Sequence, residues 1–319
     1  MAVQSEQMKG LPRAQAQSKQ KAFIKGIIAI TLSLIILIGA FLRFYELGKY
    51  SVGNTYYAAT VQSMLTSWHN YFFVSFEPGG SVTVDKPPLG FWVQALSAAI
   101  FGVNGFALAL PNVLAGPFSI PLLYYLVKRP CGTGAGLIAA LALTVTPVTI
   151  STERHNTIDG LLVFVLLRAT WAFSEAVRRG KFRYLVLGAV LVGLGFNIKM
   201  LQAYMILPAL YLVYLLGAPH KWWKRFIHLG VAAVIILIIS LSWAVVVDMT
   251  PTDERPFIGS STNNTVMELI IGHNGLSRLG LKYLLASDNA FGTGGDGGGT
   301  GPFAGGNPVS YTHLRAHET

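Results

Sequence analysis

The run GIIAITLSLIILIGAFLRFY, residues 26–45, holds one charged residue, Arg43, in a stretch long enough to cross a bilayer as a helix. Seven more apolar segments follow along the chain, at 88–104, 108–127, 133–150, 158–174, 183–198, 200–217 and 227–248. Only 12% of the residues are charged, whereas a soluble domain usually carries about 25%. This pattern predicts an all-α integral membrane protein, built as a multi-spanning helical bundle.

The lysines and arginines indicate which of these segments cross the membrane. If all eight crossed from a cytoplasmic N-terminus, three basic clusters would lie outside, at 128–129, 178–183 and 221–225. Membrane proteins keep such clusters on the cytoplasmic side. If only 88–104 stays outside the bilayer, every cluster returns to the cytoplasmic side. We therefore predict seven spans, a cytoplasmic N-terminus and one long external loop, 46–107.

Two juxtamembrane helices are expected in this external loop. The segment 88–104 is short, begins at Pro87-Pro88 and is interrupted by Gly102, which is typical of a helix lying at the membrane interface. The other predicted helix runs from Tyr56 to Trp68. Its larger apolar side chains share one stripe, formed by Tyr57, Val61, Met64, Leu65 and Trp68.

The remaining composition excludes several classes of protein. The formal net charge is +10, but the cations flank apolar runs, so the charge indicates membrane topology and not nucleic-acid binding. The single cysteine, Cys131, excludes an internal disulfide framework and a cysteine-ligated metal site. Residues 1–22 are polar and basic, and we expect them to form a disordered cytoplasmic tail. No cleavage site follows the first apolar run, so it is expected to remain as a helix.

The stretch STERHNTID, residues 151–159, carries several ionisable groups that the predicted topology places outside. Asp159 begins a span, where the helix dipole favours a carboxylate, so capping is one explanation for it. The same turn also contains Glu153, Arg154, His155 and Asn156. These are more polar groups than a cap requires, which favours a general base, a metal ligand or a phosphate-binding network.

Three other charged positions need an explanation. Asp85 and Lys86 form either a simple exposed ion pair or a pair that the following Pro87-Pro88 directs to a fixed point above the bilayer. Lys199, between two short spans, either reaches a lipid phosphate or extends to the interface alone. Arg168 lies inside a span and requires a partner. The external His69 and His273 are candidate metal ligands, with a surface role as the alternative.

Four stretches resemble glycosyltransferase family 39, which includes the protein O-mannosyltransferases and the aminoarabinose transferases of lipid A. DKPPLGFWVQALSAAIFGVNGFALALPNVLAG (85–116) resembles its first-loop motif, and ERHNTIDGLLVFVLLRATWAF (153–173) its second external loop. GLGFNIKM (193–200) resembles its later paired spans. ERPFIGSSTNNTVMELIIGHNGLSRL (254–279) is similar to the bacterial YkcB-like branch, which is provisionally named as mannosyltransferases.

The resemblance implies a GT-C fold and an inverting transferase that uses a polyprenyl-phosphate sugar at the extracytoplasmic face of a bacterial inner membrane. The sugar would be mannose or another hexose, and the acceptor a cell-envelope or protein hydroxyl. A lipid-linked sugar transporter, which would place polar residues near the bilayer midplane within broken helices, and a non-catalytic relative are the alternatives. No organic cofactor is expected.

The resemblance also implies roles for particular residues. The expected catalytic residues are Asp159, Asp85 and Lys86, and the expected substrate-binding residues are Asn54, Tyr57, Arg154, His155 and Lys199. In some members the residue at Asp85 is a divalent-metal ligand. The acidic pair that opens the family's first loop falls on Gly53 and Asn54, so Asp85 and Asp159 remain as candidate bases.

The chain divides into four expected regions. The tail 1–22 precedes a transmembrane catalytic region at 23–250. An extracytoplasmic segment follows at 251–309 and becomes glycine-rich at its end. The last stretch, 310–319, has the composition of a non-native tail, and family members continue with several more spans, so a truncated chain is expected.

Overall fold

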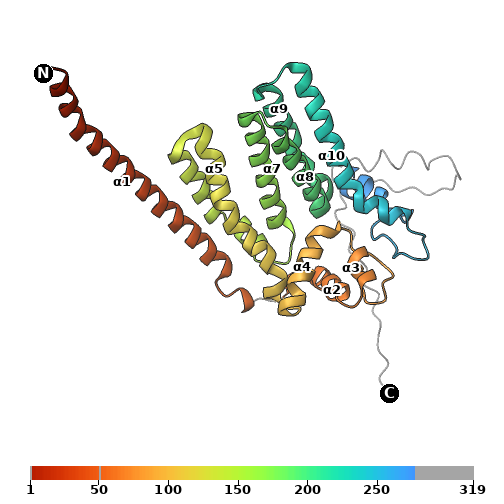
Figure 1. The fold of residues 1–319 in the computed structure, drawn as a ribbon. Helices are drawn as coiled ribbons and strands as arrows, with labels where there is room; N and C mark the ends of the chain where they lie inside the picture. The colour runs from red at the N-terminus through yellow and green to blue at the C-terminus, as the bar shows by residue number, and fades with distance from the viewer. Residues whose placement is uncertain (1, 50–51, 277–319) are drawn as a thin grey trace, which may run out of the picture. The chain divides into compact units, whose positions relative to one another are not determined.

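The computed structural model describes residues 2–49 and 52–276. Its helices are α1 (Ala2–Phe44), α2 (Thr55–Met64), α3 (Trp68–Phe73), α4 (Pro88–Phe101), α5 (Gly105–Val145), α6 (Pro147–Glu153), α7 (Asp159–Arg179), α8 (Phe182–Lys199), α9 (Leu207–Gly217), α10 (Trp222–Met249) and α11 (Val266–Glu268). Short turns of other helical types form η1 (Leu47–Lys49), η2 (Met200–Ile206) and η3 (Leu269–Leu276). The described residues contain no strand, only two isolated bridges. The predicted all-α fold is confirmed (Figure 1).

Five stretches of the described chain are long and apolar enough to cross a membrane. Two of them reverse direction inside their length. In α5 the backbone of Gly132 adopts φ 87° and ψ 171°, a conformation open to glycine. The chain folds back there, so that a Cβ on Gly136 would lie 2.9 Å from the carbonyl oxygen of Tyr124 (Figure 1).

The second reversal separates α8 from α9. Met200, directly after α8, adopts φ 48° and ψ −135°. Gly217 at the end of α9 lies against Val177 near the end of α7, where a Cβ would be 2.9 Å away. The two reversals therefore divide the five stretches of the described residues into seven helical segments. The number of membrane spans stays a prediction.

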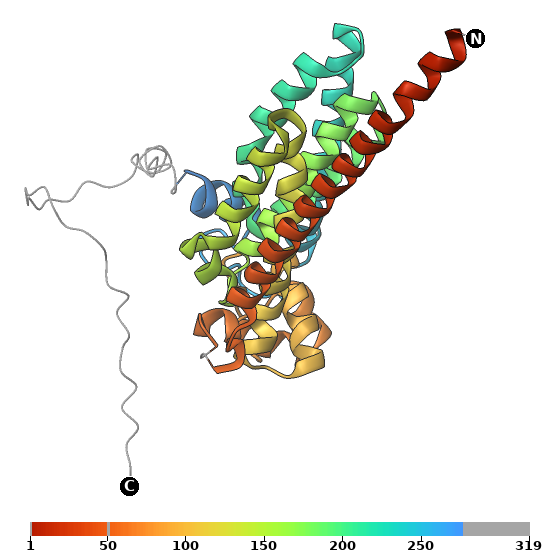
Figure 2. The same cartoon turned by 90° about the vertical axis from the view of Figure 1, so that its left-hand side faces the viewer.

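The first pass packs along one side of the bundle, with α1 beside α5 (Figure 2). Gly39 lies in direct contact with Ile120, and Ile35 is buried in the same cluster. Residues 2–22, for which we expected a disordered tail, belong to α1. Many of them are Ala, Gln and Lys, which favour helix, and extending a helix nucleated in the apolar run is easier than starting one.

The expected juxtamembrane helix 56–68 is divided in two by a cap. The hydroxyl of Ser67 accepts a hydrogen bond from the backbone N–H of Asn70 at 3.1 Å, which begins a new helix, α3. Val61 and Met64 of the predicted stripe are buried, whereas Trp68 is 85% exposed. The stripe therefore holds for α2 but not beyond it.

The short helices α2, α3 and α4 lie together at one end of the bundle (Figure 1). The indole N–H of Trp92 donates to the carbonyl of Tyr71 at 2.8 Å, and that of Trp243 to Phe72 at 3.0 Å. These bonds tie α3 to α4 and to α10. The expected extracytoplasmic segment is described only up to residue 276; its glycine-rich end and the stretch 310–319 lie outside the described residues.

Candidate functional site

The first polar pair of the site joins the start of α7 to the end of α8. Asp159 is in the first turn of α7, and Lys199 is the last residue of α8. Their side chains form an ion pair and are 34% and 17% exposed. The two helices pack side by side in opposite directions, so the start of one meets the end of the other. The sequence predicted both residues as part of the site.

The second pair is Asp85 and Lys86, immediately before α4. The ammonium group of Lys86 contacts the carboxylate of Asp85, and the Lys86 side chain is only 7% exposed. Two residues of η3 complete this cluster. The Nε2 atom of His273 lies 3.6 Å from Asp85 Oδ2, and the Asn274 amide donates to the Asp85 carbonyl at 3.4 Å. Because Lys86 is buried, this is not an ordinary exposed ion pair.

Tyr56 also belongs to this cluster, although the sequence does not single it out. Burial, and then the negative charge of Asp85, raise the pKa of Tyr56 to about 12. The Tyr56 phenol therefore lies close enough to Asp85 to feel its charge. The Tyr56 ring lies 4.6 Å from that of Phe76. No local pattern separates Tyr56 from its neighbour Tyr57, so the sequence held no signal for it.

The two pairs lie at the same end of the bundle. Gly90, in the first turn of α4, is so near Ile158 that a Cβ would be 2.6 Å from its side chain. Ile158 precedes Asp159. Gly275 of η3 is similarly close to Leu201, at 3.0 Å, just after Lys199. Two separate contacts thus pack residues next to the Asp85–Lys86 pair against residues next to the Asp159–Lys199 pair.

Asn54, expected to bind substrate, holds the start of α2 against the 154–158 loop. Asn156 accepts from the Asn54 backbone N–H and donates to its carbonyl, both at 2.7 Å. The Asn54 side chain caps α2 by accepting from the backbone N–H of Tyr57 at 3.2 Å. Gly53 has φ 73°, and a Cβ there would lie 2.7 Å from Asn156 Oδ1. A larger residue at position 53 would displace this pairing.

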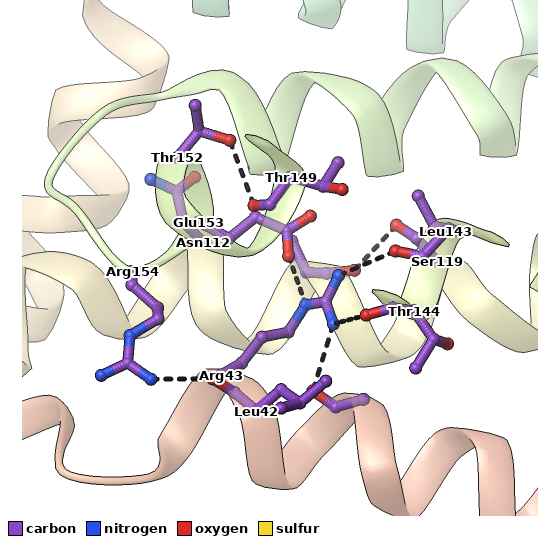
Figure 3. A network of polar contacts seen from close by, with 12 residues as sticks. Leu42, Arg43, Asn112, Ser119, Leu143, Thr144, Thr149, Thr152, Glu153 and Arg154 are labelled. Atoms are coloured by element: carbon purple, nitrogen blue, oxygen red, sulfur yellow. Dashed lines mark hydrogen bonds and ion pairs between the residues drawn. The ribbon is translucent and has the colours of Figure 1, made fainter. Parts of the chain in front are cut away.

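The other expected substrate-binding residues take different positions. His155 is exposed and lies beside Gly53, where a Cβ would be 3.1 Å from its Nδ1 atom. Arg154 donates to the carbonyl of Leu42 at 2.8 Å, on the α1 side (Figure 3). The Tyr57 ring packs edge-on against Phe91 at 5.1 Å. Lys199 contacts a candidate catalytic acid, Asp159, directly.

A buried ion pair, Arg43 with Glu153, lies next to the polar turn (Figure 3). The side chains are 0% and 2% exposed. Arg43 also donates to the carbonyls of Gly39 at 3.2 Å and of Thr144 and Leu143 at 3.3 Å. Since Pro147 has no N–H to offer the carbonyl four residues before it, Arg43 satisfies a group that the break between α5 and α6 leaves open. A single arginine in an apolar run indicates that a partner is needed, but the sequence does not show which residue it is.

Two glycines make room for the Glu153 side chain. Gly116 of α5 touches both members of the pair, and a Cβ on Gly160 would lie 2.8 Å from Glu153 Cγ. Gly160 follows Asp159 directly. The buried pair therefore packs against the backbone that carries the candidate acid.

Two buried amides hold the 154–158 loop from the other sides. Asn112 of α5 accepts from the Leu161 backbone N–H at 3.0 Å and donates to the carbonyl of Thr157. Gln94 of α4 donates to the carbonyls of Asn156 at 3.0 Å and Thr157 at 2.8 Å. These bonds fix the loop that leads into Asp159. The sequence could not identify them, because each joins residues distant along the chain.

The described part of the site offers few side chains that could bind a metal ion. Among the residues that the structure describes, no group of three or more His, Cys, Asp or Glu side chains could hold a metal ion. Asp85 and His273 are two such groups, 3.6 Å apart. His69, the other candidate, contacts Asn70 and the backbone of Glu254 instead.

Comparisons with known proteins show what the chain is similar to. Residues 85–243 match the model of a family described as dolichyl-phosphate-mannose-protein mannosyltransferase. YkcB of Bacillus subtilis (strain 168), provisionally named a mannosyltransferase, is 46% identical over 250 residues, which cover 78% of this chain and 35% of YkcB. The chain thus spans about a third of the length of this curated relative.

Two solved structures share the fold. ArnT from Cupriavidus metallidurans in the apo state aligns with a TM-score of 0.55 and 21% identity, over 83% of this chain and 51% of ArnT. ArnT bound to undecaprenyl phosphate aligns with a TM-score of 0.50 and 22% identity, over 69% of this chain and 41% of ArnT. The likeness shows that the chain has a GT-C membrane fold.

Proposed function

We propose that the protein belongs to the family described as dolichyl-phosphate-mannose-protein mannosyltransferase, whose model residues 85–243 match, and that it transfers a sugar from a polyprenyl phosphate to an acceptor hydroxyl at the extracytoplasmic membrane face. One observation supports this most. Two lysine–aspartate pairs, Lys86–Asp85 and Lys199–Asp159, meet at one end of an apolar bundle. A prenyl chain in the bilayer would bring its phosphate to the same level.

The lysines supply positive charge for the donor. When the bond from the sugar's first carbon to the phosphate oxygen breaks, negative charge collects on the departing polyprenyl phosphate. Ammonium groups already in place stabilise that charge without reorganisation. Lys86, buried and held by a neighbouring carboxylate, and Lys199, at a helix end, are the groups that would contact it.

A carboxylate takes the proton of the acceptor. As the acceptor oxygen forms its bond to the sugar carbon, its proton passes to Asp159 or Asp85, and the carbon inverts because the phosphate leaves from the opposite side. Contact of the lysines with the donor phosphate would release the carboxylates from their present ion pairs. The exposed His155 beside Gly53 is placed to contact the sugar or the acceptor.

A divalent cation fits the Asp85 cluster in part. A carboxylate oxygen and an imidazole nitrogen are common metal ligands, and Asp85 and His273 present them 3.6 Å apart. Two protein ligands leave positions open for phosphate oxygens. When bound, such a cation would add positive charge at the leaving phosphate.

The proposed orientation predicts which positions a membrane-impermeant thiol reagent reaches in intact cells. In a Cys131→Ser background, cysteines replacing Gly79 and Thr252 should label, and one replacing Lys181 should label only after the membrane is permeabilised. The sites lie in open or exposed positions, so the substitutions test sidedness and not folding. Labelling of position 181 alone in intact cells would place the site on the cytoplasmic side.

The donor class is tested with membranes that carry the complete protein. They should consume a polyprenyl-phosphate hexose and release polyprenyl phosphate, and they should not use a nucleotide sugar. The membranes should come from cells unable to make the lipid-linked donor, so that no nucleotide sugar is converted beforehand. Sugar transfer from the nucleotide donor under these conditions would refute the proposal, as would movement of the lipid-linked sugar across the bilayer without its cleavage.

A further inference from the structure

A groove of about 360 Å³ lies between α5 and α7. Its walls are Phe118, Pro121, Leu122 and Tyr125 of α5, with Phe164, Arg168 and Trp171 of α7. Asp159 and Arg168 are nine residues apart, which in an α-helix places them on opposite faces. The groove is therefore separate from the Asp159–Lys199 pair.

Arg168 is the unusual member of this lining. It is exposed, and its guanidinium lies over the ring of Phe164, 5.5 Å from the centroid. Within the described residues it has no ion pair and no hydrogen bond. The acidic residues of the surrounding helices are already paired with other cations. Glu153 pairs with Arg43, and Asp159 pairs with Lys199. Glu175 pairs with Arg129, Arg178 and Arg179.

An unpaired arginine inside a span is costly. An anion supplied from the membrane would offset this, provided that the guanidinium can reach the headgroup region. Phe164 lies five residues into α7, about 7–8 Å along the axis from Asp159. The contact with Phe164 thus directs Arg168 toward the interface at the Asp159 end.

We propose that this groove binds one anionic phospholipid of the bilayer. Its phosphate pairs with Arg168, and one acyl chain lies along Phe118, Leu122 and Trp171. The charge of Arg168 and the apolar lining match the two halves of such a lipid, because a guanidinium pairs with a phosphate through charge-assisted hydrogen bonds. The inference does not depend on the proposed transferase activity, because the groove is on the other face of α7.

Lipid retention by the purified complete protein tests the phosphate contact. Native mass spectrometry with added phosphatidylglycerol should show one retained lipid, with phosphatidylcholine bound more weakly. Arg168→Gln should weaken phosphatidylglycerol binding at least about tenfold, the effect of losing about 1.4 kcal/mol. Arg183→Gln is the matched control, because Arg183 is also exposed and lies over an aromatic ring, Tyr184, at 5.2 Å, but outside the groove. Equal binding by Arg168→Gln and the control would overturn the proposal.

Photocrosslinking identifies the occupant. Benzoylphenylalanine replaces Phe118, which is 61% exposed in the groove, or Phe226, which is 59% exposed on α10, and the protein is irradiated after extraction into detergent. A phospholipid adduct should form at 118, be lost with Arg168→Gln, and be absent at 226. A polypeptide adduct at 118 would show that another protein segment covers Arg168, and a polyprenyl-phosphate adduct would show that the groove holds donor or product lipid. Either result contradicts a bilayer phospholipid.

Discussion

Turnover of the complete protein falls at least about 100-fold when Asp159 is replaced by asparagine, while the amount of protein in the membrane is unchanged. General acid–base catalysis typically contributes about 100- to 10,000-fold, and Asp159 is one of two acids placed to accept the proton. Asparagine has nearly the size of aspartate, and Asp159 is not the N-cap of α7, which is Ile158, so the start of α7 should be preserved. The loss would then report the carboxylate's charge. Initial rates with a polyprenyl-phosphate hexose measure it.

The variant Asp85→Asn tests whether Asp85 positions Lys86 or binds a metal ion. If Asp85 positions Lys86, turnover falls and added divalent cation changes nothing. If Asp85 holds a cation together with His273, raised Mg²⁺ or Mn²⁺ partly restores the rate. Near-normal turnover in both Asp159→Asn and Asp85→Asn would show that these carboxylates serve structure and that the assigned site is wrong.

Replacing Arg43 with methionine should destabilise the protein by about 3–5 kcal/mol, the usual effect of leaving one partner of a buried ion pair without its counter-charge. Glu153 would remain 2% exposed beside Gly116 and Gly160, and the carbonyls of Leu143 and Thr144 would lose their donor. The fraction that stays folded in detergent during a temperature ramp measures the loss.

Two variants make this prediction specific to the buried pair. Arg43→Met combined with Glu153→Gln should recover a large part of the lost stability, because no charge is left unpaired. Lys49→Met removes the partner of Glu46 in an exposed pair, with Lys49 71% exposed, and should change stability by less than about 1 kcal/mol. If Arg43→Met is no less stable than Lys49→Met, the Arg43–Glu153 contact does not support the fold.

Local sequence patterns predicted the apolar helices, because the length of a segment, its hydropathy and its flanking basic residues can all be read from consecutive residues. The apolar segments follow from them, including the breaks within α5 and between α8 and α9, whereas the number of membrane spans stays a prediction. Where the predictions differ from the structure, a local preference was misjudged. The polar residues before the first span extend α1. The helix predicted for 56–68 ends at Met64, and the Ser67 cap begins a new helix, α3.

The site was predicted as a set of residues but not as contacts. Topology placed Asp159 and Lys199 on one side, yet only the antiparallel packing of α7 and α8 brings them together. The approach of His273 to Asp85 depends on η3, almost two hundred positions later in the chain. Gln94 and Asn112 were missed because each bonds backbone groups of a distant segment, which leave no sequence pattern. Arg43 stood out in its apolar run, but its partner Glu153 lies 110 positions away.

Binding of undecaprenyl phosphate to the purified complete protein tests the central claim, that the two lysine–aspartate pairs form the lipid-phosphate site, without knowledge of the sugar or the acceptor. A hydrogen bond to a charged group contributes about 1.5–3 kcal/mol, so the double variant Lys86→Met/Lys199→Met should bind at least about tenfold more weakly than the parent protein. The control Lys128→Met/Lys181→Met removes two lysines from the opposite end of the bundle and should bind as the parent does. Equal affinity of the two double variants would contradict the account.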